Sequence, residues 1–173
     1  WEQGDLETLR DNAHHNLDIL IPFVEKGSKV LVINPTCSMM MRREYSELLD
    51  GEDRERSKKL SEAVNDPSEY LWNIRNEDRF NTDVNTFING TISYHTPCHL
   101  RAQGVGFKGR DLIKKITGSK VKTVMECCGH DGTFAMKAES FDASIRIGQK
   151  SFDGMNSERS EVWVTDCPLA ALQ

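Results

Sequence analysis

Residues 124–132 have the sequence VMECCGHDG, in which two adjacent cysteines, Cys127 and Cys128, precede Gly129. A disulfide between neighbouring residues closes a strained ring, so this pair is a poor structural crosslink. Two thiols beside a glycine can instead present both sulfurs to one centre. The alternative is that both are small buried hydrophobic residues, because free cysteine is among the most buried residue types. The rest of the chain decides between these two interpretations.

The composition is that of a soluble globular protein with one domain, or with two small domains that share a core. The 173 residues are 38% hydrophobic and 28% charged, with a formal net charge of -5 at pH 7. Lysine and arginine are scattered along the chain, which argues against a nucleic-acid partner. No apolar run reaches the roughly 18 residues of a transmembrane segment. The polar start shows no signal peptide, and because it begins at Trp1 we expect an excised part of a longer protein.

The cysteine count indicates a reducing compartment. Five cysteines, an odd number, argue against a secreted disulfide framework in a chain well above mini-protein size. A set of reduced thiols in a cytoplasmic protein is the better expectation, because disulfides persist mainly in oxidising compartments.

Apolar and β-branched runs at four places indicate buried strands, and helical periodicity indicates helices between them. Strands that alternate with helices predict an α/β fold with parallel sheets flanked by helices. The expected strands cover residues 30–33, 91–95, 121–125 and 161–165. The expected helices cover 5–25, 38–49, 109–118 and 140–155, and two more begin at Asp66 and Leu169. We expect the charge-dense stretch 50–80 to form solvated helical surface and residues 81–89 to form a loop.

Every cysteine lies at or just past the C-terminal end of an expected strand. In parallel sheets, binding sites form beyond the carboxyl ends of the strands. The strand ends are therefore expected to bring five thiols toward one edge: Cys37, Cys98, Cys127, Cys128 and Cys167. Cysteines scattered through a core have no reason to follow this pattern, so the pattern favours a functional site over packing.

A faint internal repeat accompanies this pattern. Asn34-Pro35-Thr36-Cys37 and Cys167-Pro168-Leu169-Ala170 align at the proline, and each follows an apolar strand and precedes a helix. Together they suggest an ancestral Cys-Pro-x-Cys motif that lost a different cysteine in each copy. The repeat predicts two halves related by a pseudo-twofold axis, which would bring Cys37 toward the other four cysteines.

Five thiols with few nitrogen ligands suit the chemistry of a soft metal. Iron–sulfur clusters take cysteine thiolates, commonly four. Zinc is the alternative, although structural zinc usually uses paired Cys-x2–4-Cys knuckles, which the sequence lacks. Three histidines flank the cysteines, namely His95, His99 and His130. They either donate hydrogen bonds to cluster sulfur or serve as capping and packing residues.

The cysteines and their neighbours resemble the cysteine-rich CCG domain, whose pattern is Cys…Cys-Cys-Gly…Cys-x-x-Cys. The chain has Cys98, then Cys127-Cys128-Gly129 after 28 residues, then Cys167-Pro168 after 38 more. The flanking words YHTPCHLR (94–101), CGHDGTF (128–134) and VTDCP (164–168) resemble the branch that contains the cysteine-rich subunit of anaerobic glycerol-3-phosphate dehydrogenase. The wider family includes the corresponding subunit of heterodisulfide reductase and lactate-utilisation iron–sulfur proteins.

The resemblance implies two CCG domains in tandem. Residues 1–89 would be the C-terminal part of a first CCG-type half with connecting helices, and residues 90–173 the second domain. The implied cofactor is an iron–sulfur cluster of the 4Fe–4S type, including its non-cubane form. The implied binding residues are Cys98, Cys127, Cys128, Cys167 and Cys37, with Gly129 beside them. Ala170 and Asn34 stand where the pattern has cysteines, so either Cys37 replaces the ligand missing at position 170 or the site keeps an open coordination position.

The function implied by the resemblance is electron transfer in an anaerobic dehydrogenase or a heterodisulfide-reductase-like complex. The chain would then be a redox subunit whose partners are a flavin dehydrogenase subunit or a ferredoxin-type domain, and a quinone-linked membrane partner. The expected location is the cytoplasm, peripheral to the inner membrane through partner subunits. Two alternatives stay open: direct reduction of disulfides at an open cluster, and a zinc-binding docking module without redox chemistry.

Overall fold

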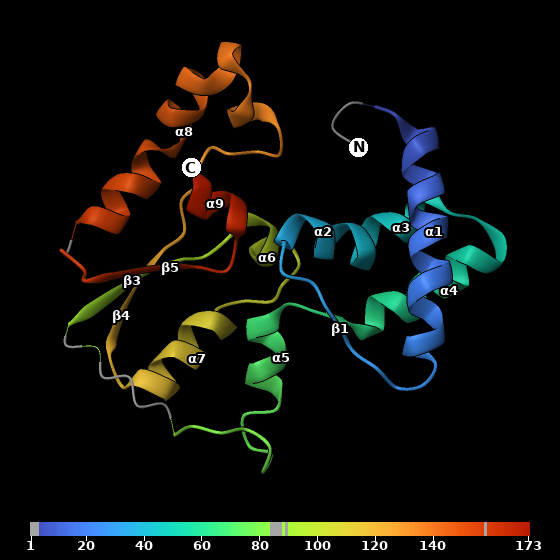
Figure 1. Cartoon of the computed structure of the whole chain (residues 1–173). Helices are drawn as coiled ribbons and strands as arrows, with labels where there is room; N and C mark the ends of the chain where they lie inside the picture. The colour runs from blue at the N-terminus through green and yellow to red at the C-terminus, as the bar shows by residue number, and fades with distance from the viewer. Residues whose placement is uncertain (1–3, 84–87, 89, 158) are drawn as a thin grey trace. The chain divides into compact units, whose positions relative to one another are not determined.

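The computed structural model describes residues 4–83, 88, 90–157 and 159–173 (Figure 1). The chain forms two compact units, Trp1–Pro67 and Ser68–Gln173. Each unit contains a parallel sheet accompanied by helices, so the predicted α/β fold class is confirmed. Among the described residues, no helix combines the length and the apolar character that crossing a membrane requires.

The first unit is built on α1 (Leu6–Val24), whose apolar side chains recur every three or four residues. Asp5 begins this helix, because its carboxylate accepts a hydrogen bond from the Thr8 N–H at 3.1 Å. The buried stripe of α1 packs against α3 (Tyr45–Leu48) and α4 (Gly51–Ala63). The shared core consists of Ala13, Leu17, Ile21, Tyr45, Leu48, Leu49, Leu60 and Val64.

The sheet of the first unit is short. Strand β1 (Val30–Leu31) pairs in parallel with β2 (Val64–Asn65). The predicted strand at 30–33 is therefore shorter than expected, because β2 offers only two residues for pairing. From β1 the chain enters a continuous helical segment of α2 (Pro35–Met39), the π-helical η1 (Met40–Glu44) and then α3. The helix expected from residue 38 thus exists and begins three residues earlier, at a proline suited to the first turn.

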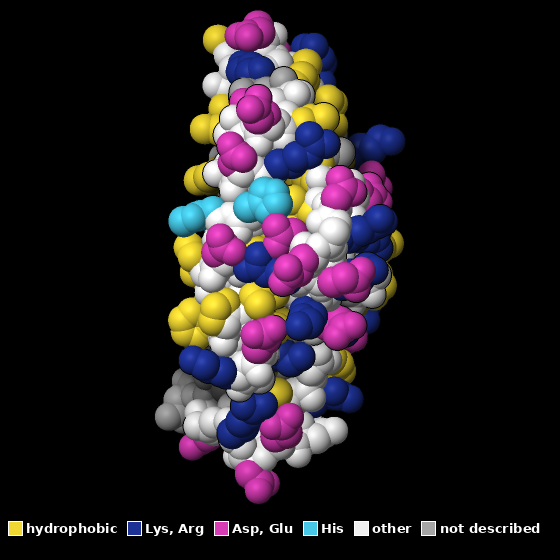
Figure 2. All heavy atoms as spheres, turned by 90° about the vertical axis from the view of Figure 1, so that its right-hand side faces the viewer, with side chains coloured by type: hydrophobic (Ala, Val, Ile, Leu, Met, Phe, Trp, Pro, Cys, Tyr) yellow, Lys and Arg dark blue, Asp and Glu magenta, His cyan; other side chains and the backbone are white. Residues whose placement is uncertain are grey.

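The charge-dense stretch after residue 50 forms α4, as predicted, and buries only one face. The buried residues of this helix are Ser57, Leu60 and Ala63. On the outer face, Lys59 forms an ion pair with Glu25 at 3.1 Å. Figure 2 shows acidic and basic side chains interspersed over this side of the molecule. Interspersed charges of this kind keep a helical face solvated without a field of one sign.

The second unit has a three-stranded parallel sheet in the order β4-β3-β5. Its strands are β3 (Thr91–His95), β4 (Lys120–Val124) and β5 (Val162–Thr165), which confirms the three predicted strands to within one residue at each end. The middle strand is the most buried, with Ile92 and Tyr94 each 1% exposed. Tyr94 is in register with residues of both neighbouring strands, so the three carboxyl ends lie at the same edge.

Two helices cover opposite sides of this sheet, α7 (Lys108–Thr117) and α8 (Ala138–Asn156) (Figure 1). The chain steps from β3 outward to β4 and then returns past β3 to β5. Right-handed crossovers in opposite directions require their helices on opposite faces. Because the connections diverge here, the carboxyl ends of β3 and β5 flank the switch point at which open parallel sheets bind ligands.

The remaining helices are short: α5 (Pro67–Asn73), α6 (Cys98–Ala102), the 3-10 turn η2 (Phe134–Met136) and α9 (Pro168–Leu172). The predicted helix starts at Asp66 and Leu169 are thus confirmed to within one residue. Of the expected loop at 81–89, residues 84–87 and 89 lie outside the described residues, and the others belong to no helix or strand. Both α6 and α9 begin at the carboxyl edge of the sheet, where the cysteines lie.

Candidate metal centre

The carboxyl edge of the three-stranded sheet carries four cysteines, and each strand contributes at least one. Cys98 is the first residue of α6, and two residues separate it from the end of β3. Cys127 and Cys128 lie in the loop that follows β4. Cys167 follows β5 and is the capping residue of α9. The structure therefore brings four of the five cysteines to one edge of one sheet.

Cys37 belongs to the other unit. It lies in α2, in the first turn after β1, and is exposed. Asn34, which the predicted repeat aligns with Cys167, begins this helix by accepting a hydrogen bond from the Thr36 N–H at 2.9 Å. Because β1 belongs to a separate sheet, a role for Cys37 beside the other four stays a prediction.

The thiols at the edge influence one another. Burial raises the pKa of Cys128 and of Cys167, and backbone hydrogen bonds oppose this rise. Nearby cysteines raise the pKa further: Cys127, Cys167 and Cys98 act on Cys128, and Cys98 acts on Cys167. The physical cause is that a thiolate disfavours a second negative charge close to it. A cation bound among them would reverse the balance and favour their thiolates.

Backbone N–H groups lie near three of the four sulfurs. The Gly129 N–H donates a hydrogen bond to Cys127 Sγ at 3.4 Å, and nearby backbone groups lower the pKa of Cys128 (His130) and of Cys167 (Ala170 and Leu169). Hydrogen bonds to a sulfur favour its charged form. At this edge burial thus favours the neutral thiols of Cys128 and Cys167, whereas nearby backbone N–H groups favour their thiolates. A positively charged centre bound there would shift the balance toward the thiolates.

The donor set fits an iron–sulfur cluster by its chemistry, with four thiols on one edge. Within the described ranges, no three Cys, His, Asp or Glu side chains are gathered tightly enough to hold a single metal ion. A single tetrahedral ion needs its sulfurs about 4 Å apart, given metal–sulfur bonds of about 2.3 Å. A cluster gives each thiolate its own iron atom, so its ligand sulfurs lie farther apart.

Gly129 has a role in packing that explains its place after the two cysteines. Its φ is +84°, a left-handed conformation that side chains disfavour, and a Cβ there would overlap the carbonyl oxygen of Ser144 on α8. On the helix, a Cβ at Gly148 would overlap the carbonyl oxygen of Cys128. The cysteine loop and α8 therefore approach each other backbone to backbone. We did not predict from the sequence that Gly148 allows this close approach, although an isolated glycine inside a helix is a signal of close packing.

Comparison with known proteins gives the family of the segment that carries this edge. The family model of the cysteine-rich domain, CCG, matches residues 92–173. Residues 92–173 are a CCG cysteine-rich domain. The resemblance predicted from the cysteine pattern is therefore confirmed.

Two curated relatives extend the likeness beyond this CCG domain. The chain is 29% identical over 172 residues to a subunit of the anaerobic glycerol-3-phosphate dehydrogenase of Escherichia coli K12, an alignment that covers 98% of this chain and 42% of that protein. It is 27% identical over 144 residues to "Lactate utilization protein A" of Geobacillus sp. WCH70, with 79% and 56% covered. The chain thus spans about half, or less, of the length of these relatives. No solved structure is significantly similar to it.

The three histidines of the CCG domain have different surroundings. His99 Nδ1 lies 3.7 Å from Cys98 Sγ, where it can donate a hydrogen bond to a thiolate. His95 is 5% exposed and uses its two ring nitrogens on Thr165 and on a backbone carbonyl rather than on sulfur. Burial lowers the pKa of His95, opposed by the hydrogen bond to that carbonyl and assisted by nearby Arg101. His130 is buried, and its Nδ1 has no hydrogen-bond partner among the described residues.

A polar network fixes the turn before Cys167. The Asp166 carboxylate accepts hydrogen bonds from the Tyr94 hydroxyl and, at 2.8 Å, from the Ser68 hydroxyl. A Cβ at Gly109 would overlap both the Asp166 carboxylate and the Tyr94 oxygen, so this space requires glycine on α7. We did not predict this network from the sequence, because its members are up to 98 residues apart.

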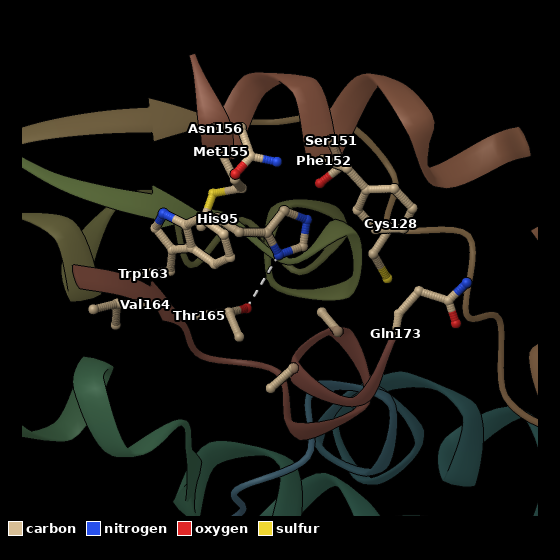
Figure 3. Close-up of a pocket in the computed structure, with 12 residues that line it drawn as sticks. His95, Cys128, Ser151, Phe152, Met155, Asn156, Trp163, Val164, Thr165 and Gln173 are labelled. Carbon is tan, nitrogen blue, oxygen red and sulfur yellow. Dashed lines mark hydrogen bonds between the residues drawn. The ribbon is translucent and has the colours of Figure 1, made fainter. Parts of the chain in front are cut away.

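A pocket of about 490 Å³ opens beside Cys128, between β5, α8 and α9 (Figure 3). Phe152, Met155 and Trp163 supply its apolar walls, and Trp163 is 60% exposed. Among the described residues, no Asp, Glu, Lys or Arg side chain lines it. Ala170, which stands in place of the last cysteine of the pattern, also lines this pocket. The candidate ligand Cys128 therefore lies in the wall of a pocket that has no charged side chain among its described lining residues.

Proposed function

We propose that the CCG domain binds an iron–sulfur cluster and that the chain is an electron-transfer part of a dehydrogenase complex. The observation that supports this most is the edge at which four thiols gather, one of which accepts a hydrogen bond from the Gly129 N–H at 3.4 Å. The relatives support it as well, because one is named as a dehydrogenase subunit and another as a lactate utilization protein.

In this proposal Cys98, Cys127, Cys128 and Cys167 hold the cluster. When bound, the cluster supplies one-electron redox chemistry of the 4Fe–4S type, cubane or non-cubane. The protein holds the thiolates, donates N–H groups to their sulfurs and buries part of the site, which together set the reduction potential. Either Cys37 serves as the further ligand, or the position facing Ala170 is open.

The larger assembly is part of the same proposal. Residues 1–89 would be the C-terminal part of a first CCG-type half with its connecting helices, and residues 90–173 the second domain. The electron donor would be a flavin dehydrogenase subunit or a ferredoxin-type domain. The uncharged pocket beside Cys128 suits a neutral acceptor, such as the quinone of a membrane partner. The complex would lie in the cytoplasm, attached to the inner membrane through its partners.

The test is anaerobic reconstitution followed by measurement of iron, sulfide and visible absorption. We expect stoichiometric iron and sulfide with broad absorption near about 400 nm, typical of sulfur-to-iron charge transfer. The four variants Cys98→Ser, Cys127→Ser, Cys128→Ser and Cys167→Ser should each lose most of the cluster. Cys37→Ser is the decisive comparison, because unchanged iron would remove Cys37 from the ligand set. Fully loaded protein that holds zinc and no sulfide would establish the docking module instead.

A second candidate function is direct reduction of a disulfide at an open cluster, in which two electrons and two protons give two thiols. It is favoured by Ala170, which leaves the pocket open beside Cys128. Addition of a small disulfide to the loaded protein should then change its EPR spectrum. Ala170→Cys should abolish that change by filling the open position, whereas a change that persists in Ala170→Cys would argue against the open site.

A further inference from the structure

We propose that His95 is a positioning residue that links the two cysteine-bearing loops on either side of β3. The inference rests on the proposed function only in taking these loops to hold the cluster. His95 is the last residue of the middle strand and is 5% exposed. Its Nδ1 lies 3.1 Å from Thr165 Oγ1, and its Nε2 lies 3.0 Å from the backbone oxygen of Glu126 (Figure 3 shows the first contact).

The partners of His95 determine where its proton lies. A backbone carbonyl can only accept, so Nε2 carries the proton and donates it to the Glu126 oxygen. In a neutral ring Nδ1 is then an acceptor, and the Thr165 hydroxyl donates to it. Thr165 Oγ1 in turn accepts a hydrogen bond from the Cys167 N–H at 3.2 Å. Each donor and acceptor in this chain of three hydrogen bonds is therefore defined.

The chain of hydrogen bonds connects two segments that the sheet does not join. Glu126 directly precedes the cysteine pair after β4, and Cys167 begins the turn after β5. Since the sheet order is β4-β3-β5, the middle strand separates these two loops. The His95 side chain spans that separation, so it fixes how far the Cys127–Cys128 pair lies from Cys167. A change in that distance would therefore change the positions of the sulfurs that hold a cluster bound by both loops.

The test uses a matched pair of substitutions at Thr165. Thr165→Ser keeps the hydroxyl, whereas Thr165→Val keeps the shape and removes it. In metal-free protein, nitrogen-15 NMR of the His95 ring should show a protonated Nε2 and an Nδ1 that accepts a hydrogen bond. Thr165→Val should shift the Nδ1 resonance, and Thr165→Ser should leave it near its wild-type position. A ring protonated at Nδ1, or at both nitrogens at neutral pH, would overturn the proposal.

The second measurement uses reconstituted protein. Thr165→Val and His95→Gln should change the EPR line shape and the midpoint potential, and should release iron to a chelator about fivefold faster, the effect of one lost hydrogen bond. Thr165→Ser should restore wild-type behaviour. Equal changes in Thr165→Ser and Thr165→Val would assign the effect to packing and overturn the link. If wild-type protein forms no cluster, the proposed function fails, whereas the NMR result still decides the hydrogen-bonded link.

Discussion

Two segments of the chain that align at a proline have the same local structure and different surroundings. In the first unit, the side chain of Asn34 accepts a hydrogen bond from the Thr36 N–H and begins α2. In the second unit, Cys167 begins α9 in a similar extended conformation and also precedes a proline, but its side chain makes no capping hydrogen bond. The two turns thus share an extended capping residue and the proline that follows it, and only the first has a side-chain cap. The difference teaches that a helix can begin at this turn with either asparagine or cysteine as the capping residue.

The surroundings of the two segments differ more than their turns. The second segment lies at the edge of a three-stranded sheet whose neighbouring loops carry three more cysteines. The first follows a two-residue strand in a two-stranded sheet. Cys167 is 8% exposed, whereas Cys37 is exposed. We therefore expect changes around the second segment to have larger effects than matched changes around the first.

The largest difference is expected between Gly129→Ala and Gly27→Ala. Both glycines have a left-handed φ, +84° and +89°, but a Cβ at Gly129 would overlap the backbone of α8, whereas nothing lies within 4 Å of one at Gly27. Conformational strain alone costs about 1 kcal/mol, and forced overlap adds about 1–3 kcal/mol. We expect Gly129→Ala to lower the opening free energy of β3 and β4 by about 2–4 kcal/mol, measured by hydrogen exchange peptide by peptide. Similar losses for both variants would show that the loop and α8 are not in close contact.

Alkylation rates of the metal-free thiols compare the two segments directly. At pH 7 we expect Cys37 to react at least about tenfold faster than Cys167, because only the thiolate reacts and Cys167 is buried. Burial raises the pKa of Cys167, so its thiolate fraction, and with it the alkylation rate, should still increase as the pH passes about 9. Mass spectrometry of differentially labelled peptides gives both rates. Equal rates at pH 7, or a Cys167 rate that levels off below pH 9, would contradict the burial of this sulfur.

The sequence predicted the strands of the second unit well for a physical reason. Each is an apolar, β-branched run with clear ends, and β3 was placed at its observed residues. The sequence did not predict β2, because Val64–Asn65 is two residues long and follows a charge-dense helix without strand periodicity. It also did not predict the π-helical turn Met40–Glu44, for which the sequence carries no local signal.

The sequence predicted that the thiols would lie at one sheet edge, but it did not predict the contacts that hold the loops around them. Strand ends and cysteine neighbours sufficed to place four thiols at one edge. The contacts that hold the loops join residues distant in sequence: His95 reaches residues 31 and 70 positions away. No periodic pattern encodes such contacts, because they depend on how the three strands are ordered in the sheet.

A smaller effect is expected from removing the side-chain cap at Asn34, which the turn at Cys167 lacks. Asn34→Ala should destabilise the first turn of α2 by about 1 kcal/mol, because the Thr36 N–H loses its acceptor. Asn34→Ser, which keeps an oxygen in place, should recover most of this. Hydrogen exchange of the peptide that contains α2 measures the change. An unchanged exchange rate in Asn34→Ala would show that the Asn34 side chain does not stabilise α2 and that the two turns are alike in this respect.

The smallest difference is expected between two ion pairs, one in each unit. Lys108 and Glu69 lie 2.9 Å apart with side chains 29% and 12% exposed, whereas Lys59 and Glu25 lie 3.1 Å apart with side chains 58% and 55% exposed. Exposed pairs contribute little, since water and salt screen them, and partly buried pairs are screened less. Lys59→Met should therefore change the opening free energy of its unit by less than about 0.5 kcal/mol, and Lys108→Met should lower that of the second unit by about 1 kcal/mol. The loss in Lys108→Met should also persist in high salt, because the Glu69 carboxylate that loses its partner is only 12% exposed. A loss that disappears in high salt would show that water and ions reach this carboxylate freely. The ion pairs of the two units would then be alike.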